Sequence, residues 1–272
     1  MWMHYSGLVF ENRHAVGTRM FHSGPRRGYI VVNLDYRLAP QTKIDEIYED
    51  VEDCAHWVRT TLPLKLGENV VDTSRLILGG GSCGAQLALT AGLYMDPPPR
   101  AIISLYALSD PTDPGRTALI PFSEVADYLG PWAPSESHPE NGLGIPNTTY
   151  RGRASALFFM LQEGMYLPSV YGSPSANEIY SKRAIRENVT AAFPPTFVAH
   201  AAQDRFVPVR QSQELVDALE RAHVPHVWYN LPGNYDHGFD VWEMSAGGES
   251  DLDKEFAAKL WPWLDSLVRA DK

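Results

Sequence analysis

The chain has 272 residues, of which 44% are hydrophobic and 21% charged, and its formal net charge at pH 7 is −10. This composition is that of a globular protein and excludes a disordered chain. The acidic balance argues against nucleic acid or an anionic membrane as the main partner. No apolar run approaches the roughly 18 residues of a membrane span, no leader-like segment opens the chain, and the two cysteines are too few for a disulfide framework. We therefore expect a cytoplasmic protein with no membrane span.

Strands and helices alternate along most of the chain. Apolar, β-branched runs predict strands, and apolar residues spaced by three and four predict amphipathic helices. In chain order, the predicted strands are residues 1–4, 29–36, 75–78, 101–106, 196–201 and 226–231. The predicted helices are residues 45–60, 85–94, 154–163, 209–222 and 252–268. Alternation of this kind indicates a parallel sheet covered by helices on both faces.

The alternation stops between residues 109 and 193. This stretch is rich in proline, glycine and aromatic residues, and it contains one convincing helix. It is too long for a plain connection between two elements. We interpret residues 109–193 as an inserted cap, and residues 1–108 and 194–272 as the two parts of one core domain.

A glycine-rich turn joins the predicted strand 75–78 to the predicted helix 85–94. Gly80, Ser82 and Gly84 fit the pattern G-x-S-x-G, in which a serine sits on a strained turn that closes only between small residues. The helix behind the turn points its N-terminus at the serine oxygen and favours negative charge there. The alternatives are an ordinary βα turn and a phosphate-binding loop, but no P-loop lysine follows.

A serine nucleophile needs a base and a carboxylate that orients the base. In this type of sheet the carboxylate comes next in the chain and the histidine last, each at the C-terminal end of a strand. Asp204 follows the fifth predicted strand and His237 follows the sixth. We therefore predict that Ser82, Asp204 and His237 are catalytic. The alternatives are a turn or cap role for Asp204 and a structural role for His237.

Other ionisable residues near these positions have simpler interpretations. His200, inside the fifth predicted strand, is interpreted as a core histidine with satisfied hydrogen bonds. Asp236 and Asp240 flank His237, and we interpret them as loop or cap residues, because adjacent loop residues rarely orient each other's side chains. No set of histidines, cysteines and acidic residues has the spacing of metal ligands, so we expect no metal.

Several of these segments together resemble the α/β-hydrolase superfamily, and within it the hormone-sensitive-lipase-like and prolyl-oligopeptidase-like carboxylesterases. They are DYRLAP at 35–40, the serine turn with QLA at 86–88, Asp204 with VP at 207–208, and HGF at 237–239. The match covers residues 1–108 and 194–272. The resemblance implies an α/β-hydrolase fold with a cap, and hydrolysis of an ester-type bond through an acyl-enzyme without a cofactor. It also implies two antiparallel strands before residue 1, which are missing from this sequence. The sheet edge exposed in this way is one that a homodimer could cover.

Family members carry a His-Gly-Gly-Gly run whose backbone N–H groups form the oxyanion hole. The matching residues here are His4-Tyr5-Ser6-Gly7. By position, the resemblance assigns the donors to Ser6, Gly7 and the residue after the nucleophile, Cys83. This run departs from the family at Tyr5 and Ser6, which could reshape the loop. Two positions of the serine turn also depart: Gly81 stands where Asp is frequent, and Cys83 stands where Ala is frequent.

A substrate pocket is expected where the cap meets the serine turn. The candidate pocket residues are Tyr5, Trp132, Phe158, Phe159 and Met165. The alternative is that the cap residues among them form the cap's own core, because large apolar side chains dominate both cores and pockets.

The predicted function is a carboxylesterase-like serine hydrolase (EC 3.1.1 type) acting on a small organic molecule. Three alternatives remain open. One is a related enzyme of a biosynthetic pathway in secondary metabolism, performing thioester or lactone release, carbon–carbon cleavage or cyclisation. Another is a non-catalytic small-molecule-binding protein on the same scaffold. A peptidase of the prolyl-oligopeptidase type lacks support, because this length leaves no room for a propeller domain.

Overall fold

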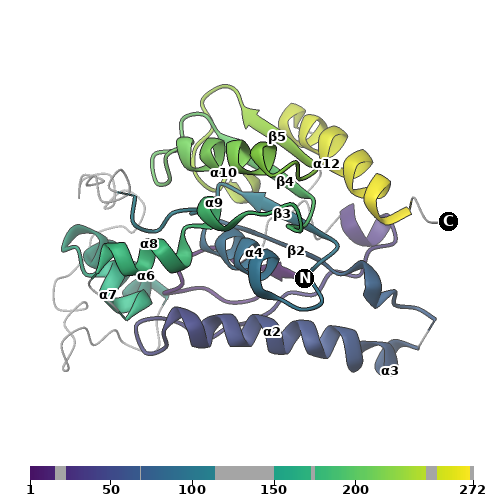
Figure 1. The fold of residues 1–272 in the computed structure, drawn as a ribbon, viewed down its shortest axis with the longest axis horizontal. Coiled ribbons are helices and arrows are strands. Elements are labelled where there is room, and N and C mark those ends of the chain that lie inside the picture. The colour runs from purple at the N-terminus through teal and green to yellow at the C-terminus, as the bar shows by residue number, and fades with distance from the viewer. Residues whose placement is uncertain (16–22, 68, 114–149, 173–174, 243–249, 270–272) are drawn as a thin grey trace.

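The computed structural model of this chain describes residues 1–15, 23–67, 69–113, 150–172, 175–242 and 250–269. A parallel sheet with the strand order β1-β2-β3-β4-β5 runs through it (Figure 1). Its strands are β1 (Trp2–Met3), β2 (Ile77–Gly81), β3 (Ala101–Leu105), β4 (Thr196–Ala201) and β5 (His226–Leu231). The parallel sheet predicted from the sequence is therefore confirmed, and β4 and β5 have the predicted bounds.

The predicted strand 29–36 is wrong in its extent. The segment forms only an isolated parallel bridge, between Trp2 and Asn33, although the N–H group of Trp2 also donates to the Val32 carbonyl at 2.8 Å. In the described residues no strand pairs with its other side, so an apolar side chain such as Ile30 stays 43% exposed. A β-branched run becomes a regular strand only when neighbouring chains take up its backbone groups.

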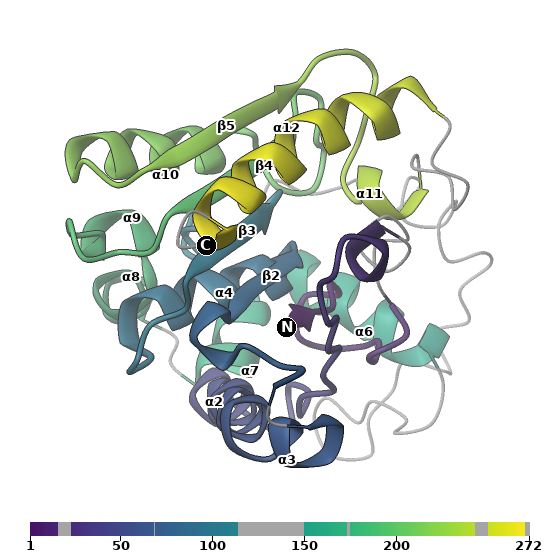
Figure 2. The same cartoon turned by 90° about the vertical axis from the view of Figure 1, so that its right-hand side faces the viewer.

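Helices cover both faces of the sheet. The helices α2 (Ile44–Thr60), α4 (Cys83–Tyr94) and α10 (Arg210–Arg221) share one hydrophobic cluster, and α12 (Asp251–Arg269) belongs to the cluster on the other face (Figure 2). Side chains alternate between these clusters along each strand. On β3, for example, Ile102 belongs to the first cluster and Ile103 to the second. The smaller elements are α3 (Leu62–Leu66), η1 (Thr73–Arg75) and α11 (Phe239–Trp242).

The described part of the predicted cap is mainly helical, and most of its helices gather at one end of the molecule (Figure 1). It contains α6 (Tyr150–Gln162), α7 (Tyr166–Tyr171), α8 (Ala176–Arg183) and α9 (Ile185–Asn188). The sequence predicted only the first of these, because the others are too short for a clear apolar period. Leu157 and Tyr166 share the hydrophobic cluster of α2 and α4. The division into core and cap thus remains a prediction.

The C-terminal ends of the strands meet at one edge of the sheet, as in every parallel sheet. The residues placed there are His4 after β1, Ser82 after β2, Tyr106 after β3, Asp204 after β4 and His237 after β5. Ligands of open α/β sheets bind at this edge, so the predicted catalytic residues lie where a substrate site is expected.

Candidate active site

The serine turn has the strained backbone that its sequence pattern predicts. Ser82 lies between β2 and α4 with φ 55° and ψ −123°, a conformation that costs a non-glycine residue free energy. The turn is held because the Ser82 N–H group donates to the Leu105 carbonyl at 2.9 Å. A Cβ atom on Gly84 would lie 2.3 Å from the carbonyl oxygen of Met3. Only glycine allows α4 to approach β1 this closely.

Asp204 and His237 are joined directly. His237 Nδ1 lies 2.7 Å from Asp204 Oδ2, and the other carboxylate oxygen accepts the N–H groups of Phe206 and Val207 at 2.8 Å each. The Asp204 side chain is 0% exposed, whereas that of His237 is 18% exposed. The carboxylate thus fixes the ring of a histidine that solvent can reach.

The charge of His237, together with hydrogen bonding, keeps Asp204 ionised in spite of its burial. Burial by itself raises the pKa of this carboxyl group, but the charge of His237 and hydrogen bonds from His200 and His237 outweigh it. The resulting pKa of Asp204 lies well below its ordinary value. At neutral pH the group is therefore an acceptor for the imidazole N–H and not a proton donor.

His200 is a second histidine on the same carboxylate. Its Nε2 atom lies 3.0 Å from Asp204 Oδ2 and 2.9 Å from the Val207 carbonyl oxygen, and its Nδ1 atom lies 2.7 Å from Ser212 Oγ. The interpretation as a satisfied core histidine is confirmed. Its contact with Asp204 was not predicted from the sequence, although a spacing of four residues across a strand end was a usable signal.

The loops that carry Asp204 and His237 are tied together by Asp236. One of its carboxylate oxygens accepts the N–H groups of Arg205 at 3.0 Å and of His237 at 2.8 Å. The guanidinium group of Arg205 also pairs with this carboxylate, with Nε and Oδ2 2.6 Å apart. The interpretation of Asp236 as a loop residue is confirmed. For Asp240 it is wrong, since Asp240 is buried in α11 and accepts a hydrogen bond from Tyr106.

Tyr106 links the serine turn to His237. The centroids of the Tyr106 and His237 rings are 4.6 Å apart in an edge-to-face arrangement. A Cβ atom on Gly81, directly before Ser82, would lie 2.3 Å from the Tyr106 hydroxyl oxygen. The serine turn and the histidine thus border one ring. Within the described residues no hydrogen bond joins Ser82 Oγ to His237, so the catalytic roles of Ser82, Asp204 and His237 stay predictions.

The predicted oxyanion loop has a backbone that exposes its N–H groups. Ser6, Gly7 and Leu8 have φ values of 120°, 62° and 66°. The N–H group of Leu8 donates to Cys83 Sγ at 3.3 Å, whereas in the described part of the chain those of Ser6 and Gly7 donate to no protein atom. Adjacent N–H groups in such a turn form an anion-binding nest. The arrangement fits the predicted donors Ser6, Gly7 and Cys83, whose roles remain predictions.

A buried pair supports this loop from beneath. The ring of His4 stacks on that of Tyr36 with centroids 4.0 Å apart, and the Tyr36 hydroxyl donates to the His4 carbonyl at 2.7 Å. Burial lowers the pKa of His4 to about 4, so its ring is neutral at physiological pH. The motif residue Tyr36 thus anchors the first residue of the loop.

Of the predicted pocket residues, the structure brings Phe158 toward His237. The ring centroids of Phe158 and Phe206 are 6.0 Å apart, and those of Phe206 and His237 are 5.5 Å apart. Phe206 was not predicted, although it lies two residues after Asp204. Phe159 is 37% exposed and shares none of these ring contacts.

The other pocket candidates have different positions. Tyr5 belongs to the oxyanion loop and is half-buried. Met165, directly before α7, packs against the main hydrophobic cluster, which supports the alternative of a cap core for this residue. Trp132 lies outside the described residues.

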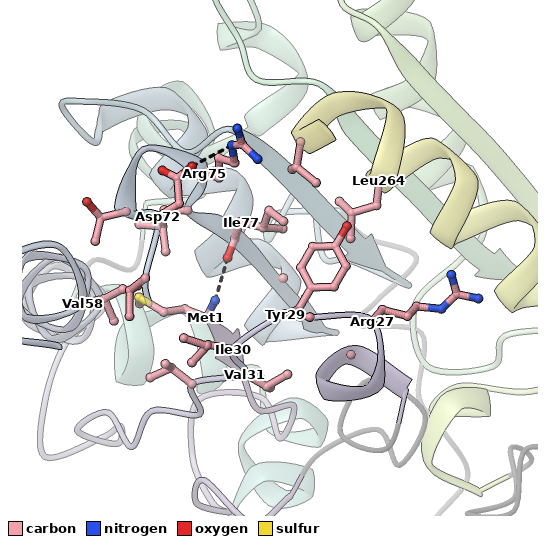
Figure 3. A pocket seen from close by; sticks show the side chains of 18 of the residues that line it. Met1, Arg27, Tyr29, Ile30, Val31, Val58, Asp72, Arg75, Ile77 and Leu264 are labelled. Atoms are coloured by element: carbon pink, nitrogen blue, oxygen red, sulfur yellow. Dashed lines mark hydrogen bonds and ion pairs between the residues drawn. The ribbon is translucent and has the colours of Figure 1, made fainter. Parts of the chain in front are cut away.

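A cavity of about 540 Å³ lies at the opposite edge of the sheet (Figure 3). Met1, Tyr29, Ile77 and Leu264 are among its lining residues. Since Ile77 begins β2 and Ser82 follows its end, this cavity is separate from the candidate active site. Among the described residues no group of three or more side chains could hold a metal ion, and no helix is long and apolar enough to cross a membrane.

Comparison with known proteins decides the fold family. A family model described as "alpha/beta hydrolase fold" matches residues 1–130. A solved α/β-hydrolase superfamily protein from Enterococcus faecalis superposes with a TM-score of 0.68 at 20% identity, covering 97% of this chain and 89% of that one. Carboxyl esterase 2 from Tuber melanosporum superposes with a TM-score of 0.62 at 18% identity, covering 98% and 78%. The chain has the α/β-hydrolase fold. The fold that the sequence resemblance implies is therefore confirmed.

The curated relatives of this chain are much longer proteins. The non-reducing polyketide synthase Preu6 of Preussia isomera is 24% identical over 99% of this chain and 13% of its own length. The methylphloroacetophenone synthase of Cladonia uncialis is 27% identical over 89% of this chain and 11% of its own length. The chain therefore spans about an eighth of the length of these relatives.

Proposed function

We propose that the chain is a serine hydrolase that cleaves an ester-type bond of a small organic molecule through an acyl-enzyme on Ser82. Ser82 Oγ attacks the carbonyl carbon, and its proton passes to Nε2 of His237, the ring nitrogen that Asp204 does not hold. His237 then protonates the leaving group. In the second half of the cycle His237 takes a proton from water, which attacks the acyl-enzyme. His237 then returns the proton to Ser82 Oγ as the acid is released.

The observation that carries the proposal is the hydrogen bond of 2.7 Å between His237 Nδ1 and the fully buried Asp204 carboxylate. It leaves the second ring nitrogen available for proton transfer and fixes the tautomer that a general base requires. The strained backbone of Ser82, at the C-terminal end of β2 on the same edge of the sheet, supplies a matching nucleophile position.

The oxyanion loop is proposed to stabilise the negative charge that develops on the carbonyl oxygen of the substrate. The N–H groups of Ser6 and Gly7, together with that of Cys83 at the start of α4, are the proposed donors. A helix N-terminus adds a favourable field for an anion. Losing one such donor typically costs about a hundredfold or more in rate.

The polyketide synthase relatives favour a second candidate within the same chemistry. The names of these relatives describe synthases, and this chain aligns with one section of each. The bond cleaved is then a thioester or lactone of a biosynthetic acyl group. The acyl acceptor is either water or another group of the same substrate molecule. The ring of Phe206 beside His237, with that of Phe158 next to Phe206, suits a flat or aromatic acyl group. A cytoplasmic location and a possible homodimer stay predictions.

Labelling with a fluorophosphonate probe tests the proposal. We expect the wild-type protein to be labelled and Ser82→Ala not to be, with Ser266→Ala on α12 as the matched serine control. Turnover of a panel of short aryl esters and acyl thioesters then separates the two candidates. Retained labelling of Ser82→Ala excludes Ser82 as the nucleophile. Absence of labelling in the wild type favours the non-catalytic binding protein.

A further inference from the structure

A buried tyrosine–aspartate pair lies beside the candidate catalytic histidine. Tyr106 follows β3 with φ 38°, is 0% exposed, and donates its hydroxyl hydrogen to Asp240 Oδ1. Asp240 belongs to α11, which begins directly after the His237-Gly238 turn. Besides His237, the Tyr106 ring contacts Phe239 edge to face, with centroids 5.4 Å apart. One hydrogen bond thus connects the end of β3 to the segment that carries His237.

The serine turn leaves room for this pair. Gly81 has no side chain, and its Cβ position lies 2.3 Å from the hydroxyl oxygen and 2.7 Å from Cζ of Tyr106. The family resemblance puts an aspartate at this position in many members. In this chain the space over the turn is filled by the Tyr106 hydroxyl, and the nearby carboxylate comes from Asp240.

We propose that Tyr106 and Asp240 form a positioning pair that sets the orientation and the charge balance of His237. Asp240 fixes the Tyr106 hydroxyl, and the Tyr106 ring, wedged between Gly81 and His237, fixes the imidazole against the serine turn. Both are positioning residues, because they are buried and act through His237. The catalytic consequence rests on the proposed function, whereas the effect on His237 itself does not.

The ionisation of the pair agrees with this arrangement. Burial raises the pKa of Asp240 to about 6, an effect that the Tyr106 hydrogen bond and the charge of His237 reduce. Burial and the Asp240 charge raise the pKa of Tyr106 well above its ordinary value, so its hydroxyl remains a donor. Above pH 6 the Asp240 carboxylate carries a negative charge. Coupling between ionisable groups is reciprocal, so a change of charge at Asp240 acts on His237.

Other ionisable groups act on the same histidine. Asp204 bonds its Nδ1 atom, and Asp236, which pairs with Arg205, accepts its backbone N–H group. Tyr5 on the oxyanion loop influences Tyr106 electrostatically. Since these groups are unchanged in variants of the pair, a shift in the His237 titration reports on Tyr106 and Asp240.

The test is an NMR titration of the His237 imidazole in the unliganded protein, with its signal assigned from His237→Gln. Asp240→Asn keeps the size of the side chain and removes its charge, so we expect the His237 pKa to fall by about 0.5 to 1 unit. Tyr106→Phe keeps the ring and removes the donor. Asp240 then holds its proton to higher pH, and the His237 pKa falls in the same direction. The double variant Tyr106→Phe/Asp240→Asn should show the same His237 titration as Asp240→Asn alone, because both substitutions break one interaction.

A second tyrosine–aspartate pair supplies the control. Tyr29 donates to Asp265 Oδ1 at 2.7 Å at the opposite edge of the sheet, where Figure 3 shows Tyr29 lining the cavity. Tyr29→Phe removes the same hydroxyl donor, and Asp265→Asn removes the same carboxylate charge. We expect both to lower stability without moving the His237 titration. An unmoved titration in Asp240→Asn and Tyr106→Phe, or strictly additive shifts in the double variant, overturns the proposal.

Activity gives a separate readout. In hydrolysis of p-nitrophenyl acetate, we expect the acidic limb of the kcat/KM profile to move with the His237 pKa, and kcat to fall more than KM rises. Fluorophosphonate labelling of the wild type distinguishes the two possible failures. If the wild type is not labelled and the His237 titration shifts in the variants, the positioning role of the pair is supported and the proposed hydrolase function is not. If the wild type is labelled and neither the His237 titration nor the pH profile shifts in the variants, the proposed hydrolase function is supported and the positioning role of the pair is not.

Discussion

A Cβ atom on Gly81 would lie 2.3 Å from the hydroxyl oxygen of Tyr106, so these two residues can occupy their positions only because Gly81 has no side chain. The hydroxyl is held in turn by the buried Asp240. The residue before the candidate nucleophile is therefore determined by packing against the neighbouring strand end.

Gly81→Ala should damage both stability and activity. The added methyl group meets a fully buried ring, and overpacking of this kind costs about 1–3 kcal/mol of unfolding free energy. Tyr106→Ala in the same chain removes the overlap, so the double variant should be more stable than the sum of the single effects implies. Chemical denaturation measures both. Strict additivity would show that the two side chains do not compete for this space.

Asp204→Asn should abolish most turnover while the protein stays folded. The amide can hold the imidazole in the wrong tautomer, and the comparable change in serine proteases lowers kcat by about 10⁴-fold. Asp217→Asn on α10, whose carboxylate accepts from Gln213, is the matched control and should leave turnover unchanged. Ester hydrolysis with circular dichroism of each variant checks the expectation. Wild-type turnover in Asp204→Asn would contradict the assignment.

His4→Phe should change how stability depends on pH. Burial lowers the pKa of His4 to about 4 from an ordinary value of 6.5, so between these values the unfolded chain binds a proton that the folded protein does not. The wild type therefore loses up to about 3 kcal/mol from this group as pH falls from 6.5 to 4. Phenylalanine keeps the stacking on Tyr36 and removes the titration.

The difference in unfolding free energy between wild type and His4→Phe is the quantity to measure, at several pH values. The raised pKa of Asp240, about 6, acts in the opposite direction, because stability from that group falls as pH rises toward 6. It is present in both proteins and cancels in the difference. His14→Phe, at an exposed position, should leave the pH dependence as in the wild type. A difference for His4→Phe that does not change with pH would refute the role of burial.

Arg153→Met should loosen the segment that directly follows the oxyanion loop. Arg153 is buried on α6, and its guanidinium group donates to the carbonyl of Val9 at 2.6 Å and to that of Ala39 at 2.9 Å. Removing it leaves buried acceptors unpaired, at about 1–3 kcal/mol for each lost partner. We expect lower stability and a fall in kcat larger than the rise in KM.

Arg37→Met is the matched control for this loss. Arg37 belongs to the DYRLAP segment but pairs with Asp50 and Glu49 at the exposed surface, and exposed ion pairs contribute little. Thermal unfolding and ester kinetics should separate the two arginines. Equal effects of both substitutions would show that the buried hydrogen bonds of Arg153 contribute no more to stability and turnover than the exposed ion pairs of Arg37.

The sequence predicted those elements whose signal is local. The strands 196–201 and 226–231 have the predicted bounds, and the helices α2, α4, α10 and α12 lie within two residues of prediction. The strand 29–36 failed, because an apolar run does not specify how many neighbours its backbone will have. The short helices α7, α8 and α9 were missed, since fewer than three turns carry little periodic information.

By itself, the sequence determined the parallel alternation of strands and helices and the strand–turn–helix around Ser82. It also placed Asp204 and His237 at strand ends in the required order. These features depend on residues close together in the chain. Only the tertiary structure decided that His200 shares the Asp204 carboxylate, that Phe206 lies beside His237, and that Tyr106 pairs with Asp240. That last hydrogen bond joins residues 134 positions apart. No local pattern encodes such a pairing, because packing of the strand ends creates it.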